Sequence, residues 1–310
     1  MQNKSENLIS YLESIINMRI LITGSNGLLG QYLVEQIKNL KIDFLATSIG
    51  SNRNTRLSDL QYQELDIKDE HQVKQVFEGF QPTHVIHTAA VTNVDQCELD
   101  PKLCQEVNVR ATQLLFEAAV RFNAHFQLLS TDFVFDGQQG NYKETDPVHP
   151  LSVYGQSKVD AENLLIQSSY SNWSIVRTII VYGIGENLSR GNLITWSKSM
   201  LEEGKEMNVV DDQFRSPTYA DDLAKGCLAI LQRQKTGIYH ISGPETYSIF
   251  DIVTKIADHY GFDKSKMHRI SSATLNQPAK RPPFTGFDLT KAKQDLAYQP
   301  LDLEQTLQFL

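Results

Sequence analysis

A tyrosine and a lysine stand four residues apart in the segment Tyr154-Gly-Gln-Ser-Lys158. On a helix this spacing puts the phenol and the ammonium on one face. A free tyrosine has a pKa of about 10, and a nearby cation stabilises its phenolate and lowers that value. A tyrosine tuned in this way can protonate a carbonyl oxygen while a hydride reaches the carbonyl carbon. The spacing therefore predicts Tyr154 as the proton donor of a carbonyl reduction, assisted by Lys158.

A threonine hydroxyl is expected beside this pair. Thr131 lies in an apolar segment, residues 125–135, that is predicted to be a strand, and its hydroxyl can hold the same carbonyl oxygen. A tyrosine and a lysine at this spacing are also common by chance as an exposed surface pair. The pattern becomes specific because a dinucleotide-type loop precedes it in the chain.

That loop is Gly24-Ser-Asn-Gly27-Leu28-Leu29-Gly30, between an apolar strand over residues 18–24 and a helix from residue 28. Glycines at this spacing permit a tight turn and let the backbone approach a pyrophosphate, which then rests on the N–H groups of the helix start. Alternatively, the loop uses its glycines only to turn. The strand before it and the helix after it favour dinucleotide binding.

The segment after the second strand indicates which nucleotide is bound. NAD sites usually have an acid there to hold the ribose hydroxyls, but residues 47–53 contain none and end in Arg53. Arg53, or with less support Arg56, can bind a 2′-phosphate. The sequence therefore predicts NADPH, with NADH possible. Asp66-Ile67 and Ala89-Ala90, at the ends of the third and fourth strands, are expected to lie along the cofactor.

The elements that must position these residues alternate between strand and helix. The fold class predicted from this alternation is α/β, a doubly wound parallel sheet of the Rossmann type. Strands are expected over residues 18–24, 41–48, 62–67, 83–90, 125–135, 173–183 and 237–243, and helices over 28–40, 69–80, 100–122, 154–167, 192–203, 216–234 and 248–261, with a short one from residue 290.

The domain organisation is predicted from a break in this alternation after residue 183. Residues 18–183 and 221–243 are assigned to the dinucleotide-binding domain, and 184–220 and 244–310 to a smaller, discontinuous α/β substrate lobe. Ligands commonly bind in the crevice between two such parts. Residues 1–17 are predicted to be an extension that forms a surface helix, with no assigned function.

Composition excludes several classes of protein. The chain has 310 residues, of which 41% are hydrophobic and 21% charged, and a net charge of −8, which argues against a nucleic-acid partner. No apolar run reaches the ~18 residues of a membrane span. Three cysteines without a CxxC pair predict no metal site and a cytoplasmic location. Cys97 and Cys104 are expected on the same side of one helix.

Several motifs of this sequence together resemble those of a known family. TGSNGLLG, HTAA, STDFVFDG and YGQSK are together similar to the extended short-chain dehydrogenases/reductases. RTIIVYG, DDQFRSPTYADDLA and RPPFTGFD narrow the likeness to the dTDP-4-dehydrorhamnose reductases, over nearly the whole chain from Met18. The resemblance implies an oxidoreductase that uses a nicotinamide cofactor to reduce the 4-keto group of a dTDP-deoxysugar, for polysaccharide biosynthesis.

Site residues follow from the resemblance by position. It implies Thr131, Tyr154 and Lys158 as the catalytic residues, contacts to the cofactor from Gly27-Leu28-Leu29, Asp66-Ile67 and Ala89-Ala90, a sugar bordered by Asp132 and Phe133, and an Asn108 that steadies the catalytic lysine. In the family a tyrosine usually stands at the position of Phe133 and a tryptophan at that of Ile180. These two departures leave the identity of the sugar open.

The sequence also offers other candidate site residues and other possible functions. Arg281 either clamps a diphosphate or is an ordinary surface arginine. Asp95 and Glu98 are either paired carboxylates or decorate a loop and a helix start. The same fold and triad also serve nucleotide-sugar epimerases and dehydratases, and the resemblance extends to the non-catalytic regulatory β subunit of methionine adenosyltransferase. A homodimer is a possible assembly.

Overall fold

A seven-stranded sheet forms the centre of the computed structural model, which describes residues 17–310. The strand order is β11-β6-β5-β4-β1-β2-β3, and every neighbouring pair is parallel. The predicted Rossmann-type sheet is confirmed. Its strands are β1 (Arg19–Thr23), β2 (Asp43–Ser48), β3 (Tyr62–Glu64), β4 (His84–His87), β5 (His125–Thr131), β6 (Trp173–Thr178) and β11 (Gly237–His240).

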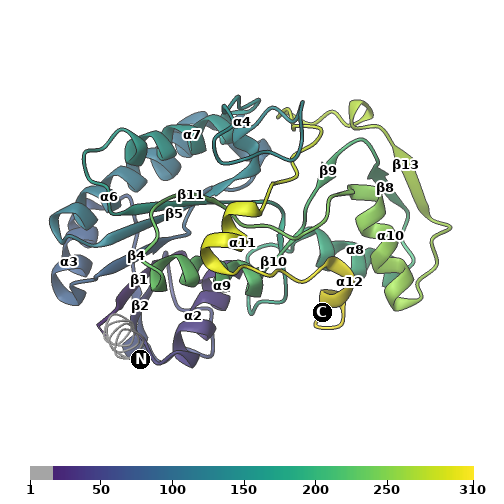
Figure 1. Ribbon diagram of the computed structural model, residues 1–310. Helices are drawn as coiled ribbons and strands as arrows, with labels where there is room; N and C mark the ends of the chain where they lie inside the picture. Colours follow the sequence, from purple (N-terminus) through teal and green to yellow (C-terminus); the bar gives the residue numbers. More distant parts are fainter. Residues whose placement is uncertain (1–16) are drawn as a thin grey trace, which may run out of the picture.

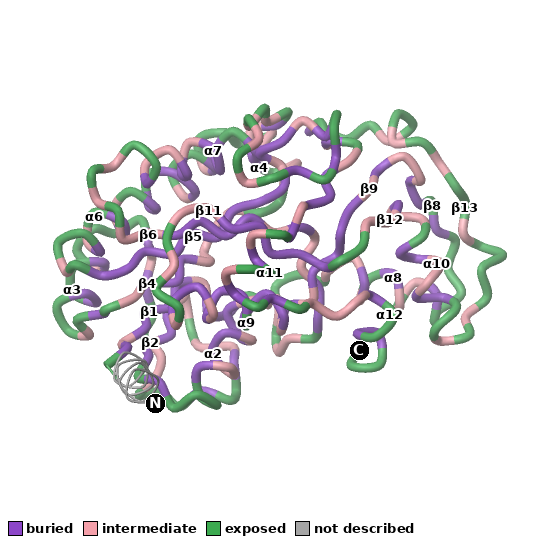
Figure 2. Tube along the Cα trace, viewed as in Figure 1, coloured by how far each residue is buried: buried purple, intermediate pink, exposed green. Residues whose placement is uncertain are grey.

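Helices cover both faces of this sheet (Figure 1). One face carries α3 (Glu70–Phe80), α6 (Ala111–Arg121) and α7 (Val153–Ile166), and the other carries α2 (Leu28–Asn39), α9 (Ala220–Gln232) and α11 (Thr290–Leu296). Side chains alternate between the faces, so Ile20 and Ile22 join one apolar cluster and Leu21 joins the other. All seven residues of β5 are buried, as Figure 2 shows for the centre of the sheet.

The order of the strands reverses at β1. The chain proceeds from β1 to β2 and β3 on one side, and then returns to place β4, β5, β6 and β11 on the other. In doubly wound sheets the loops at such a reversal diverge and leave a crevice at the carboxyl ends of the strands. The strand ends at Thr23, His87 and Thr131 therefore border the place where a ligand is expected.

The helical segment before β5 is more broken than its sequence predicts. The predicted helix over 100–122 consists of α5 (Pro101–Gln105), a π-helical turn over Glu106–Arg110 and α6. A separate helix, α4 (Val94–Leu99), precedes it and carries Cys97. The expectation that Cys97 shares a helix with Cys104 is wrong because Asp100 leaves helical geometry and caps α5 with its side chain. Both thiols are nevertheless buried in one cluster.

Several predicted strands end early, and the two largest differences, in β5 and β6, occur at the crevice. β5 stops at Thr131 and a 3₁₀ turn, Asp132–Val134, follows it. β6 stops at Thr178, and the chain then forms β7 (Val181–Tyr182), which pairs with β10 (Thr218–Tyr219) outside the main sheet. Between them Ile180 has a φ of +33°, an unfavourable backbone conformation for a β-branched residue.

A second group of elements lies beyond the sheet, on the side away from α3 (Figure 1). It surrounds its own apolar cluster, which includes Ile194, Val209, Ile256 and Leu303. Its elements are α8 (Leu193–Glu202), β8 (Met207–Val210), β9 (Phe214–Arg215), β12 (Tyr247–Ser248), α10 (Ile249–Tyr260), β13 (Met267–Ile270) and α12 (Leu303–Leu307). Two short 3₁₀ turns lie elsewhere, at Asp59–Gln61 before β3 and at Ser272–Thr274 after β13.

The helices predicted within residues 1–17 and over residues 248–261 have different outcomes. The helix predicted within residues 1–17 lies outside the described residues except for Asn17. The helix predicted over 248–261 is present as α10, and the Ser248 hydroxyl accepts a hydrogen bond from the Asp251 N–H at 3.0 Å as an N-cap. Within residues 17–310 no helix has the length and apolarity that crossing a membrane requires.

Candidate active site

A cavity of about 860 Å³ lies at the carboxyl edge of the sheet, where the strand order reverses. We call it the crevice. The glycine loop, the ends of β4 and β5, helix α7 and the loop over residues 183–192 all contribute to its lining. Its volume is in the range of small-molecule sites.

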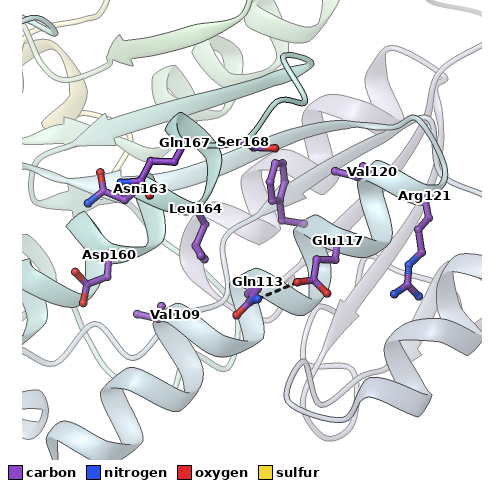
Figure 3. Close-up of a pocket in the computed structure, with 11 residues that line it drawn as sticks. Val109, Gln113, Glu117, Val120, Arg121, Asp160, Asn163, Leu164, Gln167 and Ser168 are labelled. Carbon is purple, nitrogen blue, oxygen red and sulfur yellow. Dashed lines mark hydrogen bonds between the residues drawn. The ribbon is translucent and has the colours of Figure 1, made fainter.

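A second hollow, of about 830 Å³, lies between α6 and α7 on the outer face (Figure 3). Its lining comes from these two helices, from Val109 in the π-helical turn and from the residues that follow α7. Gln113 and Glu117 are hydrogen-bonded to each other at 2.9 Å. No strand end and no residue of the predicted triad reaches it. The chemistry predicted from the sequence therefore belongs to the crevice.

The glycine loop is shaped by close approaches of its backbone. Gly24 has a φ of +76°, and a Cβ at this position would lie 2.7 Å from the Ala89 nitrogen. At Gly30 a Cβ would lie 2.5 Å from the Gly24 carbonyl oxygen. Gly27 is the N-cap of α2, and within residues 17–310 no side chain caps the N–H groups of its first turn, which borders the crevice. This cradle fits the pyrophosphate of a dinucleotide.

Almost every residue predicted to touch a cofactor lines the crevice, and Asn108 is the exception. The lining includes Gly24, Gly27, Leu28, Leu29, Gly30, Arg53, Asp66, Ile67, Ala89, Ala90, Tyr154 and Lys158. Within residues 17–310 the Arg53 side chain forms no ion pair. Arg56, the weaker candidate, is bound to Glu35 and Glu186 and does not line the crevice.

Asn108 forms hydrogen bonds within the protein and does not line the crevice. It is buried in the π-helical turn, where its Nδ2 donates to the Val91 carbonyl and to the Ser157 hydroxyl, each at 3.0 Å. Its Oδ1 accepts from the Val91 N–H at 2.8 Å. The side chain therefore joins the segment after β4 to α7 at the residue before Lys158, and it makes no hydrogen bond to Lys158.

The Tyr154 ring is buried at the start of α7. Phe133 meets it edge to face, with ring centroids 5.8 Å apart, and Cys97 and Cys104 pack against it. Burial raises the pKa of Tyr154, while the nearby Thr131 hydroxyl acts in the opposite direction. The phenol is consequently protonated at neutral pH, which is the form that donates a proton.

Lys158 lies one helical turn further along α7. Its Nζ donates a hydrogen bond of 2.7 Å to the Leu129 carbonyl, and burial lowers its pKa to about 8 although the Glu162 carboxylate opposes this shift. The pKa of Tyr154 is raised rather than lowered, contrary to the expectation from spacing. The ammonium is directed at a strand carbonyl, and burial outweighs the other influences on the phenol.

Comparisons with known proteins identify the family of this chain. Residues 18–310 match the family model described as the RmlD substrate binding domain. The chain belongs to the RmlD substrate-binding domain family. The predicted resemblance to its reductases is thereby confirmed.

Three relatives illustrate the breadth of the RmlD family. A dTDP-4-dehydrorhamnose reductase of Aggregatibacter actinomycetemcomitans is 36% identical over 305 residues, which covers 93% of this chain and 97% of the relative. The methionine adenosyltransferase 2 subunit beta of Xenopus laevis is 30% identical over 263 residues, covering 83% and 77%. The crystal structure of a Bacillus anthracis dTDP-4-dehydrorhamnose reductase in complex with NADP has a TM-score of 0.82 at 28% identity, covering 94% and 97%.

In this RmlD-family chain, a buried ion pair joins α7 to β6. Glu162 follows Lys158 by one further turn of α7 and binds Arg177 of β6 through two hydrogen bonds, of 2.6 and 3.0 Å. Both side chains are at most 3% exposed, and the Ser130 hydroxyl also donates to Glu162 at 2.5 Å. Sequence reasoning missed this pair, although Tyr154, Lys158 and Glu162 follow one another at four-residue intervals.

A second buried ion pair joins Thr131 to the C-terminal part of the chain. The Thr131 hydroxyl donates to Asp132 Oδ1 at 3.0 Å. Asp132 Oδ2 accepts from the Thr285 hydroxyl at 2.5 Å and lies 3.5 Å from Arg215 Nε. Arg215 also donates to the Pro282 carbonyl at 2.6 Å. Asp132 therefore holds the strand end and the loop around residues 282–285 together.

The structure does not place Arg281 as the sequence suggested. Its guanidinium makes a two-pronged ion pair with Asp95, at 2.7 and 3.1 Å, and it is absent from the lining of the crevice. The same ion pair lowers the pKa of Asp95. Glu98 is not paired with Asp95 either, since it accepts from the Val153 N–H at the start of α7 at 3.0 Å. Arg281 thus fastens the proline-rich loop to α4.

Proposed function

We propose that this chain is a nicotinamide-dependent reductase that converts the 4-keto group of a dTDP-activated deoxysugar into a hydroxyl. The observation that carries the proposal is that Thr131, Tyr154 and Lys158 line the same crevice as the glycine loop. Family membership supports the substrate class, because the relatives from A. actinomycetemcomitans and B. anthracis are both dTDP-4-dehydrorhamnose reductases.

Each member of the triad has a distinct role in this proposal. The bound nicotinamide supplies the hydride. Tyr154 gives its phenolic proton to the carbonyl oxygen, and the Thr131 hydroxyl turns from Asp132 Oδ1 to hold that oxygen in place. Lys158 places a positive charge one helical turn from the phenol, which favours the phenolate that remains after proton transfer.

NADPH is the proposed cofactor. The glycine cradle fits a pyrophosphate, and Arg53 lines the crevice at the end where β2 stops, without an ion pair in residues 17–310. An arginine in this position suits a 2′-phosphate. The NADP in the B. anthracis relative supports the same choice. The three cysteines are buried free thiols, which is compatible with a reducing compartment such as the cytosol.

The substrate lobe is proposed to comprise residues 184–220 and 244–310 except α11, which packs on α9 and on β11 of the main sheet. The separate apolar cluster around Ile194, Val209 and Ile256 supports this division. Phe133 and Ile180 line the crevice, so both are placed to contact the sugar. Neither offers the hydroxyl or the indole usual in the family, and the reductase therefore has fewer polar contacts with which to select its sugar.

The test is the absorbance of NADPH during incubation with dTDP-4-dehydrorhamnose, with NADH in a parallel assay. We expect oxidation of NADPH and formation of a dTDP-6-deoxyhexose, with NADH used less efficiently. Absence of turnover with this substrate and with other dTDP-4-ketosugars would overturn the proposal. Conversion without net oxidation of NADPH would assign the site to an epimerase or a dehydratase.

A second candidate is a regulatory subunit, because a methionine adenosyltransferase β subunit is 30% identical to this chain. In that case the purified chain would form a stable complex with a methionine adenosyltransferase and would not consume NADPH. Size-exclusion chromatography of the mixture separates the two functions. The burial and hydrogen bonding of Tyr154 and Lys158 favour the reductase.

A further inference from the structure

The loop over residues 183–192 reaches from the glycine-loop helix to the far side of the crevice. Near its start, the Glu186 N–H donates to Gln31 Oε1 and the Gln31 side chain donates back to the Glu186 carbonyl, both at 2.8 Å. At its end, Asn192 Nδ2 donates to the Gly183 carbonyl at 2.9 Å. The loop is therefore fixed at both ends, and its stretch over 188–191 lines the crevice.

Arg190 extends from this stretch across the crevice. Its Nη2 donates a hydrogen bond of 2.5 Å to the Thr92 hydroxyl, which follows β4. Its side chain is exposed, and it forms no ion pair with a carboxylate in the described part of the chain. It lines the same crevice as Tyr154, and its positive charge acts against the stronger effect of burial on the pKa of that phenol. A guanidinium so placed is available to an anion.

The other cationic side chains near the crevice either lie at its opposite end or are bound to other groups of the protein. Arg53 and Lys68 follow β2 and β3, at the end where an adenosine is expected. Lys158 is buried against the Leu129 carbonyl. Arg215 and Arg281 are paired with Asp132 and Asp95. A sugar nucleotide brings two phosphate charges toward the reacting end of the crevice, and Arg190 is the exposed cation there that the described carboxylates leave unpaired.

We propose that Arg190 binds the diphosphate of the sugar nucleotide and holds the loop over residues 183–192 across the occupied crevice. The inference rests on the proposed function for its substrate class. Guanidinium groups bind phosphate oxygens in pairs through a planar set of donors. The cofactor's own pyrophosphate has the N–H groups at the start of α2, whereas Arg190 is bonded to Thr92, next to α4 and on the side of Tyr154.

The experiment measures the binding of dTDP and of thymidine by calorimetry, with the full chain saturated with NADP⁺. Thymidine lacks the diphosphate, so the ratio of the two Kd values reports the contribution of the phosphates. We expect Arg190→Ala to weaken dTDP by about 10- to 100-fold and to leave thymidine unchanged, the range of a hydrogen-bonded charged group. Arg190→Lys should recover part of this loss, because it keeps the charge without the planar donors.

A matched control is Arg233→Ala, since Arg233 is an exposed arginine that follows α9 and does not line the crevice. It should leave both Kd values as in the wild type. Equal dTDP affinity in Arg190→Ala and wild type overturns the inference. So does a loss of NADPH affinity in Arg190→Ala without a loss for dTDP, which would assign Arg190 to the cofactor. Binding of dTDP needs no turnover, so a failure of the proposed reaction is seen separately in the NADPH assay.

Discussion

The two halves of the crevice are built from different parts of the chain. The nucleotide half, around Gly24–Gly30, is shaped by backbone, with a left-handed glycine and N–H groups at a helix start. The reacting half, around Thr131 and Tyr154, is shaped by side chains held in buried ion pairs and hydrogen bonds. Cofactor binding in the backbone-built half depends on the shape of the glycine loop, whereas the reaction in the side-chain-built half depends on charge and protonation. Changes to the two halves should therefore produce different losses.

Removing the phenolic hydroxyl should affect the reacting half most. Tyr154→Phe keeps the ring that packs edge to face on Phe133 and deletes the proton donor. We expect kcat to fall by ~10² or more, the range of general acid catalysis, while the Kd for NADPH stays near that of the wild type. Stopped-flow turnover and fluorescence titration measure the two quantities. A variant that turns over like its parent would remove Tyr154 from its role.

Breaking the buried ion pair beneath the triad should reduce stability rather than cofactor affinity. Glu162→Gln leaves Arg177 buried and without its carboxylate, and we expect the free energy of unfolding to fall by about 3–5 kcal/mol in urea titrations. The double variant Glu162→Met/Arg177→Met should recover much of this loss. Glu78→Gln, which removes an exposed ion pair with Lys74, is the matched control and should change little.

A methyl group added in the glycine loop should affect the nucleotide half alone. In Gly30→Ala the Cβ meets the Gly24 carbonyl at 2.5 Å, and backbone cannot yield as a side chain can. We expect the loop to shift at a cost of about 1–3 kcal/mol, so that NADPH binds about 10- to 100-fold more weakly. Gly79→Ala, where nothing lies within 4 Å, should leave NADPH binding intact. Unchanged affinity in Gly30→Ala would show that the turn is not a phosphate cradle.

Alkaline pH should separate the two halves without any mutation. The pKa of Lys158 is lowered to about 8, so its ammonium is charged below this pH and neutral above it. Because the charged form assists the phenolate, kcat should fall by about 10-fold as the pH rises one unit above that pKa. The Kd for NADPH should stay level over the same range. A kcat that stays level up to pH 9 would contradict the role of the Lys158 charge.

The same contrast explains how much of the molecule can be predicted from its sequence. The alternation of strands and helices predicts the sheet, because apolar runs and helical stripes are local signals. The glycine loop and the Tyr154–Lys158 spacing are also local, and each lies within eight residues. Their meeting in one crevice follows from the parallel sheet, since the carboxyl ends of neighbouring strands share one edge.

Contacts between distant segments could not be predicted in this way. Asp132 contacts Arg215 and Thr285, and Arg281 contacts Asp95, because the folded chain brings distant segments together. No regular spacing in the sequence indicates these contacts. An arginine in a loop looks the same whether it binds a phosphate or a carboxylate. The break at Ile180 was missed for a related reason, because local strand propensity continues through it while tertiary contacts decide. The break at Asp100 is instead marked locally, because Asp100 precedes Pro101 and caps α5.

The π-helical turn over Glu106–Arg110 makes the middle of this helix sensitive to length. Such a turn holds one residue more than an α-helical turn, so deleting a single residue there would restore regular winding. Because the wider turn absorbs this extra residue, the segments on either side would keep their facing, and the deletion would remove the turn that presents Asn108. Homologous chains that share the Asn108 contact to Val91 and Ser157 should therefore tolerate substitutions in this stretch far better than insertions or deletions.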